Sequence, residues 1–158
     1  MLFLLFQVGE DRYALEATRI VEVVPLLELK PLSQAPQGVA GIFDYRGCPV
    51  PVLDLSALIL GRPADELLST RIIIVNHPDE FGTNHLLGLM AERATGTLRK
   101  DAREFTAPGL QKGSSPHLGP ILMDDSGPIQ WVHEQRWLPQ GVCKLLFSER
   151  APAGHEAS

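Results

Sequence analysis

Short apolar runs that end at turn residues are the feature that most limits how this 158-residue chain can fold. The runs FLLFQV (3–8) and RIIIVNH (71–77) have the length of strands, and helices usually need longer periodic segments. Gly, Pro, Asn and Asp follow many of these runs, as they do between the strands of hairpins. The chain is therefore predicted to be mainly β, with many short strands in barrels or a sandwich.

The same pattern assigns the elements along the chain. Strands are predicted at 3–8, 13–15, 39–47, 49–55, 71–77, 85–92, 94–100, 117–125 and 127–132. Residues 16–27 should begin as a helical turn and continue as a strand, and short helices are predicted at 56–61 and 133–141, with 142–147 as a candidate extension. The Gly-, Pro- and Ser-rich residues 101–117 predict a long surface loop. A single domain over 1–147 and a disordered tail over 148–158 are expected.

Charge and composition disfavour several classes of partner. The net charge is -5 and the charged residues make up 21% of the chain, so the basic footprint of a nucleic-acid-binding protein is missing. An acidic surface also argues against binding to anionic membranes. The opening MLFLLF is too short to span a bilayer and lacks the flanks of a signal peptide, so it is interpreted as a buried strand. A cytoplasmic protein without direct membrane insertion is expected.

No combination of residues predicts an enzyme, a cofactor or a metal site. None of the five histidines has the spacing of a helical metal motif, although His77 and His85 flank one hairpin and could meet across it. Cys48 lies between Gly47 and Pro49 at a turn, with no helix N-terminus implied that would activate it for nucleophilic catalysis. Two cysteines far apart, Cys48 and Cys143, are interpreted as reduced thiols.

The stretch GIFDYRGCPVPVLDL (41–55) places charged residues inside the most apolar part of the chain. The turn of this hairpin is predicted at Gly47–Cys48, and the prolines at 49 and 51 predict an edge strand or one paired on one side only. Asp54 follows a strand and precedes a short helix, which favours a capping role. Arg46 could pair internally with Asp44 or Asp54, or it could offer its guanidinium to a partner.

The run VAGIFDYRGCPVPVLDL resembles the signature of the CheW family of chemotaxis coupling proteins. Further resemblances follow in order: FQVGEDRYAL, RIVEVVP, IIIVN with LLGLMAE, and LGPILMDDSGPIQWVHEQRWL, so that the likeness covers about residues 3–140. It implies a CheW-like fold of two small five-stranded β-barrels, SH3-like subdomains packed side by side across a hydrophobic seam, with short helices.

The resemblance also implies a non-enzymatic adaptor. Its partners would be the cytoplasmic hairpin of a methyl-accepting chemotaxis-type receptor and the regulatory domain of a CheA-type histidine kinase, at membrane receptor arrays. Matching positions suggest the partner-binding residues Ile20, Glu22, Val39, Gly41, Asp44, Arg46, Gly88 and Met90, with structural roles for Gly47 and Asp54. In this picture Gly41 admits a partner helix closely, and Gly88 and Met90 help to line a groove for the receptor.

Four positions depart from the family pattern. Asp44 stands where Asn is usual, Tyr45 where Leu is common, and Glu92 and His133 where Asp is usual. An aspartate at position 44 could pair with Arg46, and these departures suggest a specialised coupler.

Two other classes of function stay open from the residues alone. A small-barrel nucleic-acid-binding module would fit the short strands, but it needs aromatic residues among basic ones, and aromatic residues are 6% of the chain. A thiol or metal hydrolase would need a constellation that the chain does not show. A coupler-like barrel used for a different protein–protein interaction is the remaining alternative.

Overall fold

A computed structural model describes residues 1–78, 81–107 and 119–133 of the chain. The predicted helix at 133–141 (apart from its first residue), its candidate extension at 142–147 and the predicted tail at 148–158 lie outside these residues. The described strands are β1 (Leu2–Val8), β2 (Asp11–Glu16), β3 (Ile20–Pro25), β4 (Val39–Tyr45), β5 (Cys48–Asp54), β6 (Arg71–Pro78), β7 (Asn84–Arg99), β8 (Ile121–Asp124) and β9 (Gly127–Trp131). The described helices are the 3-10 turns η1 (Ala17–Arg19) and η2 (Ala102–Glu104) and the α-helix α1 (Leu55–Leu60).

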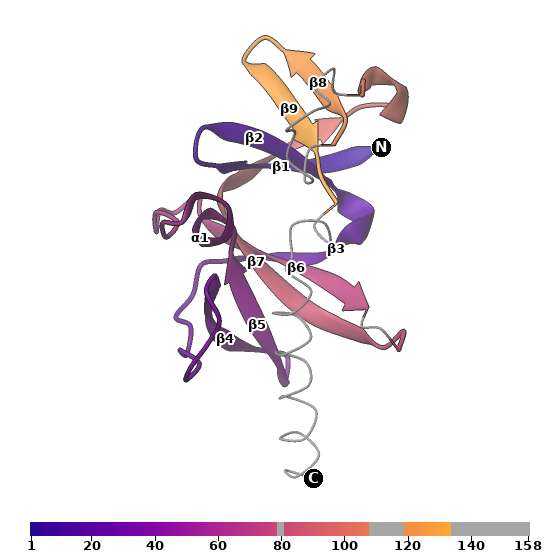
Figure 1. Cartoon of the computed structure of the whole chain (residues 1–158). Coiled ribbons are helices and arrows are strands. Elements are labelled where there is room, and N and C mark those ends of the chain that lie inside the picture. The colour runs from indigo at the N-terminus through magenta and orange to yellow at the C-terminus, as the bar shows by residue number, and fades with distance from the viewer. Residues whose placement is uncertain (79–80, 108–118, 134–158) are drawn as a thin grey trace.

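Two lobes of five strands share one long strand. Lobe A contains β7, β1, β2, β9 and β8 in that order, and lobe B contains β4, β5, β7, β6 and β3. Figure 1 shows the two lobes, with β7 running between them and α1 beside it. The mainly β prediction and the number of strands in each lobe are confirmed, but the described strand pairings do not close either lobe into a barrel.

The strand β7 corrects the prediction of two strands at 85–92 and 94–100. It continues through residue 93, where Arg93 takes a left-handed conformation with φ of 50°. The pairing of β7 with β1 shifts register between Leu5 and Gln7, as it does at a β-bulge. A bulge bends a strand without ending it, and the apolar pattern alone does not distinguish it from a turn.

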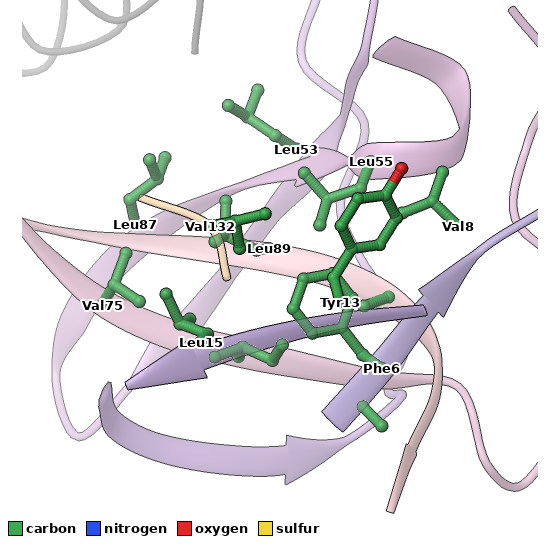
Figure 2. Close-up of a cluster of buried hydrophobic side chains, with 13 residues drawn as sticks. Phe6, Val8, Tyr13, Leu15, Leu53, Leu55, Val75, Leu87, Leu89 and Val132 are labelled. Carbon is green, nitrogen blue, oxygen red and sulfur yellow. The ribbon is translucent and has the colours of Figure 1, made fainter. Parts of the chain in front are cut away.

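The buried apolar residues form three clusters, one in each lobe and one between the lobes. The strands β6 and β7 are buried on both faces, which separates the cluster between the lobes from the core of lobe B. Figure 2 shows the cluster between the lobes, whose members come from β1, β2, β5, β6 and β7 together with Leu55 and Val132. On β6, Ile73 and Val75 belong to this seam cluster, whereas Ile72 and Ile74 belong to the core of lobe B. The alternation follows from the two-residue period of a strand. The seam is the feature that the family resemblance implied.

Lobe A has a core of its own, which contains three aromatic side chains packed against one another. The rings of Phe3, Phe105 and Trp131 lie 5.2–5.3 Å apart between centroids. Phe105 is buried and follows η2, and Thr106 forms a bridge to Ile121. The prediction of a surface loop over 101–117 is therefore wrong for its first residues, because burial of one aromatic side chain anchors a segment of polar composition.

The pairing of β2 with β9 covers only three residues, and an ion pair reinforces it. Arg12 donates to both carboxylate oxygens of Asp124 and, at 2.8 Å, to the carbonyl of Gly127. The ion pair holds the pKa of Asp124 below its usual value and raises that of Arg12. The β8–β9 hairpin is thus attached to β2 by both backbone and side-chain bonds.

We expect the stability of the fold to fall at high pH because of Tyr13. Burial and, to a smaller extent, the charge of Asp11 raise the pKa of Tyr13 to about 12, against about 10 in an unfolded chain. Between these values the unfolded state releases a proton that the folded state keeps, so the free energy of unfolding decreases as the pH rises. Urea unfolding of the wild type and of Tyr13→Phe, followed from pH 8 to pH 11, should show a shallower decrease in the variant. An identical decrease in both proteins would contradict this assignment.

Candidate functional site

The β4–β5 hairpin turns at Arg46–Gly47, one residue earlier than predicted. Tyr45 pairs with Cys48, and the two residues between them have φ values of 52° and 84°. Positive φ at both positions is the geometry of a type I′ turn, which suits the right-handed twist of the strands. Gly47 adopts it readily, whereas Arg46 is a residue that seldom does. The turn therefore presents the arginine at its outermost point.

Arg46 pairs with Glu22 of β3, and not with Asp44 or Asp54, the two internal partners that were one alternative from the sequence. Its Nη2 lies 3.2 Å from Oε1 of Glu22, and its guanidinium carbon lies 5.2 Å from the centre of the Tyr45 ring. The Arg46 side chain is nevertheless 77% exposed. An exposed ion pair of this kind contributes little stability, about 0–1 kcal/mol, so stability alone does not explain its presence.

Tyr45 is the member of this site that sequence reasoning missed. Its hydroxyl donates a hydrogen bond to Oε1 of Glu22, the same atom that pairs with Arg46. That bond to the carboxylate is the main reason why the pKa of Tyr45 is raised. Glu22, Tyr45 and Arg46 are called the hairpin-tip cluster below. The only signal in the sequence was the aromatic residue directly before the arginine.

The first half of β5 is paired on one side only, as its prolines predicted. Pro49 and Pro51 lie opposite Asp44 and Ile42 of β4, and the pairing with β7 begins only at Val52. A residue without an N–H can occupy such an edge without losing a ladder bond. Asp44, opposite Pro49, is exposed on the outer strand of this hairpin.

The two predicted contact glycines are buried inside lobe B. A Cβ atom on Gly41 would lie 2.8 Å from the carbonyl oxygen of Lys30 and 2.9 Å from Cβ of Leu29. A Cβ atom on Gly88 would lie 2.9 Å from a methyl group of Ile72. The segment that approaches Gly41 closely therefore belongs to this chain, and the expectation of a partner helix at Gly41 and a receptor groove at Gly88 is corrected.

The other predicted contact residues lie in two further places. Ile20 is half-buried and packs against the seam cluster. Val39 and Met90 line a pocket at the opposite end of the β4–β5 hairpin from Arg46. The structure thus brings Glu22 and Arg46 together, and it places Val39 and Met90 elsewhere.

Asp54 holds two segments of backbone with one buried carboxylate. Its Oδ1 accepts hydrogen bonds from the amides of Ser56 (3.0 Å) and Ala57 (3.2 Å) in the first turn of α1. Its Oδ2 accepts a bond of 2.9 Å from the amide of Ala64, in the loop after that helix. The residue is the N-cap of α1 and also an anchor for the following loop.

Glu92, one of the departures from the family pattern, holds the next amide of that loop. Its Oε2 accepts a bond of 2.7 Å from the amide of Asp65, and the residue is buried. Asp54 lies opposite Met90 on the neighbouring strand, so the two carboxylates project from adjacent strands toward consecutive residues, Ala64 and Asp65. The glutamate at position 92, which is longer than the usual aspartate, thus has the structural role of binding the loop at Asp65.

No metal centre is assembled among residues 1–78, 81–107 and 119–133. His77 and His85 are direct neighbours across β6 and β7, but the described part of the chain contains no group of three His, Cys, Asp or Glu side chains placed to hold a metal ion. Cys48 is a half-buried free thiol. The described residues also include no helix that is both long enough and apolar enough to cross a membrane.

These features define a two-lobed β domain with a charged hairpin tip and a pocket whose lining is partly apolar and partly acidic. The family model of the CheW-like domain matches residues 2–139, and the chain therefore belongs to the CheW-like domain family.

Similar proteins agree with this assignment. The chain is 26% identical over 97 residues to the chemotaxis protein CheW of Helicobacter pylori, which covers 61% of this chain and 56% of the relative. It is 27% identical over 108 residues to the chemotaxis protein CheW of Treponema pallidum, covering 65% and 60% of the two chains. The matches thus span somewhat more than half the length of these relatives. The crystal structure of the scaffolding protein TtCheW from Thermoanaerobacter tengcongensis has the same fold, with a TM-score of 0.69, 21% identity, and coverage of 84% of this chain and 83% of that one.

Replacement of Asp54 should destabilise the domain more than loss of a helix cap alone. Asp54→Ala removes three hydrogen bonds to a buried carboxylate, so we expect the free energy of unfolding to fall by about 2–4 kcal/mol. Asp44→Ala, at an exposed position of the same hairpin, is the control and should change it by less than about 0.5 kcal/mol. Denaturant unfolding checks both values, and equal effects of the two substitutions would contradict the anchoring role.

Proposed function

We propose that this protein is a non-enzymatic adaptor that couples a chemoreceptor to a kinase. It would bind the cytoplasmic hairpin of a methyl-accepting chemotaxis-type receptor and the regulatory domain of a CheA-type histidine kinase, in the cytoplasm at receptor arrays. The observation that carries the proposal is the exposure of Arg46. The arginine of the CheW-like signature stands at the tip of a hairpin, in a chain whose match to the CheW-like domain extends over residues 2–139.

The hairpin-tip cluster has the properties of a prearranged contact. A guanidinium group carries five N–H donors, and the bond to Glu22 uses only Nη2, so donors remain for a carboxylate or carbonyl oxygen of a receptor helix. Glu22 and the ring of Tyr45 restrict the orientation of the long side chain before a partner arrives. Less conformational entropy is then lost on binding.

Apolar surface beside the cluster would supply the remaining affinity. Val21 precedes Glu22 on β3 and is an exposed large apolar residue, and Ile20 is half-buried. An exposed apolar residue next to a charged cluster suits the docking of an amphipathic helix. We therefore keep Ile20, Glu22, Asp44 and Arg46 in the proposed receptor contact and add Tyr45. Gly41 and Gly88 act from inside the lobe.

Arg46→Ala should weaken receptor binding without unfolding the domain. We expect the dissociation constant for a purified receptor cytoplasmic hairpin to rise about tenfold or more, as at an arginine hot spot, while binding to the kinase regulatory domain stays within about twofold. Because the side chain is exposed, the melting temperature should change little. Calorimetric titration against each partner measures the two constants.

Arg103→Ala is the matched control for this experiment. Arg103 is also exposed, at 91%, and its guanidinium also pairs with a carboxylate, that of Asp101, at 3.2 Å. It should leave both affinities unchanged. Equal loss in the two variants would indicate general electrostatics and contradict a contact at Arg46. If the folded wild type binds neither cognate partner but shows salt-dependent binding of an oligonucleotide, the adaptor function itself is wrong.

A further inference from the structure

A pocket of about 560 Å³ opens in lobe B away from the hairpin tip. Its apolar lining comes from Leu26 and Leu29 after β3, from Val39 at the start of β4, and from Met90 of β7. Val39 and Tyr45 stand at opposite ends of β4, and a strand rises about 3.3 Å per residue, so the Val39 side of the pocket lies about 20 Å from the hairpin tip. It is a separate surface with its own chemistry.

The charged residues that line this pocket are all acidic. They are Glu28, Asp54 and Glu66. Asp54 is already bound to three amides, so the exposed Glu28 and Glu66 supply the negative charge at the rim. Arg62, in the same loop as Glu66, directs its guanidinium elsewhere, because Nη2 lies 3.8 Å from the point that a Cβ atom on Gly9 would occupy. The mouth of the pocket therefore favours a cationic group.

The loop at one side of the pocket presents two leucines to solvent on a fixed backbone. Leu67 is 53% exposed and Leu68 is fully exposed, and both follow Glu66 directly. The amide of Thr70 donates to the carbonyl of Leu67 at 3.0 Å, and the amide of Ala94 donates to the carbonyl of Ser69 at 3.0 Å. With Ala64 and Asp65 held by buried carboxylates, the loop is ordered at both ends. Two adjacent leucines that stay in water on an ordered loop are typical of a contact surface.

We propose that the pocket and residues 66–68 bind a segment of a partner protein in which an apolar side chain stands beside a lysine or arginine. The apolar side chain enters between Leu26, Leu29 and Met90, and the cationic group meets Glu28 and Glu66 at the rim. A second copy of this chain is the less suitable occupant, because two chains of net charge -5 repel each other. The proposal does not depend on the role of Arg46.

The three methionines allow a direct test on the intact protein. With the methionine methyl groups labelled for NMR, Met90 reports on the pocket. Met1, at the N-terminus, and Met123, on β8, are exposed and act as internal references. The probe is a short synthetic peptide in which leucines alternate with lysines, and its counterpart carries glutamate in place of each lysine. We expect the lysine peptide to shift the Met90 signal in a saturable way and the glutamate peptide to leave it unchanged.

Charge reversal at the rim separates specific binding from general attraction. Glu28→Lys combined with Glu66→Lys should weaken the binding of the lysine peptide about tenfold, because two exposed charge contacts are reversed. Glu10→Lys combined with Asp125→Lys changes the net charge equally at exposed turns of lobe A and should leave binding within about twofold. The proposal is overturned if the two double variants bind alike, if both peptides shift Met90 equally, or if Met90 shifts with protein concentration alone, which would indicate a second copy as the occupant.

Discussion

The architecture depends on one strand that belongs to both lobes. The first part of β7 pairs with β5 and β6, and its last part pairs with β1, with the bulge at Arg93 between them. A shared strand leaves the lobes little freedom to move apart, because separation would break backbone bonds on both sides. It also brings apolar faces of both lobes together, and the seam cluster fills the space between them.

Carboxylates have two different roles in this fold. The buried carboxylates bind backbone amides and fix the position of a loop, whereas the more exposed carboxylate binds side chains and orients an arginine. Asp54 and Glu92 are almost inaccessible, and the bonds that they accept come from backbone amides. Such bonds compensate the cost of burying a carboxylate and fix the loop that forms one wall of the pocket. Glu22 is more exposed, and its partners are the side chains of Tyr45 and Arg46. The two arrangements explain why three carboxylates on strands of the same lobe have different roles.

The elements that depend on local pattern could be predicted from the sequence, and those that depend on neighbours could not. The strand over 71–77, the 3-10 turn before β3 and the cap at Asp54 follow from apolar runs and from residues adjacent in the chain. The position of the β4–β5 turn was missed by one residue because an arginine with positive φ is uncommon. The contact of Arg46 with Glu22 joins residues 24 positions apart, and the packing of Leu29 and Lys30 on Gly41 is also non-local. Neither has a periodic signature.

The contacts of Tyr45 change the interpretation of the two positions, 44 and 45, at which the signature differs from the family pattern. An aspartate at position 44 could have neutralised Arg46, but the structure pairs the guanidinium with Glu22. Where a leucine would offer only apolar surface, the tyrosine ring lies under the guanidinium and its hydroxyl binds the same carboxylate. One carboxylate oxygen accepting two donors holds all three side chains in a single arrangement, so the charge of Arg46 is oriented without being buried. A partner that binds here meets the oriented ion pair of Arg46 and Glu22, with the exposed Asp44 nearby. Its own charged groups must be complementary to this arrangement of one positive and two negative charges.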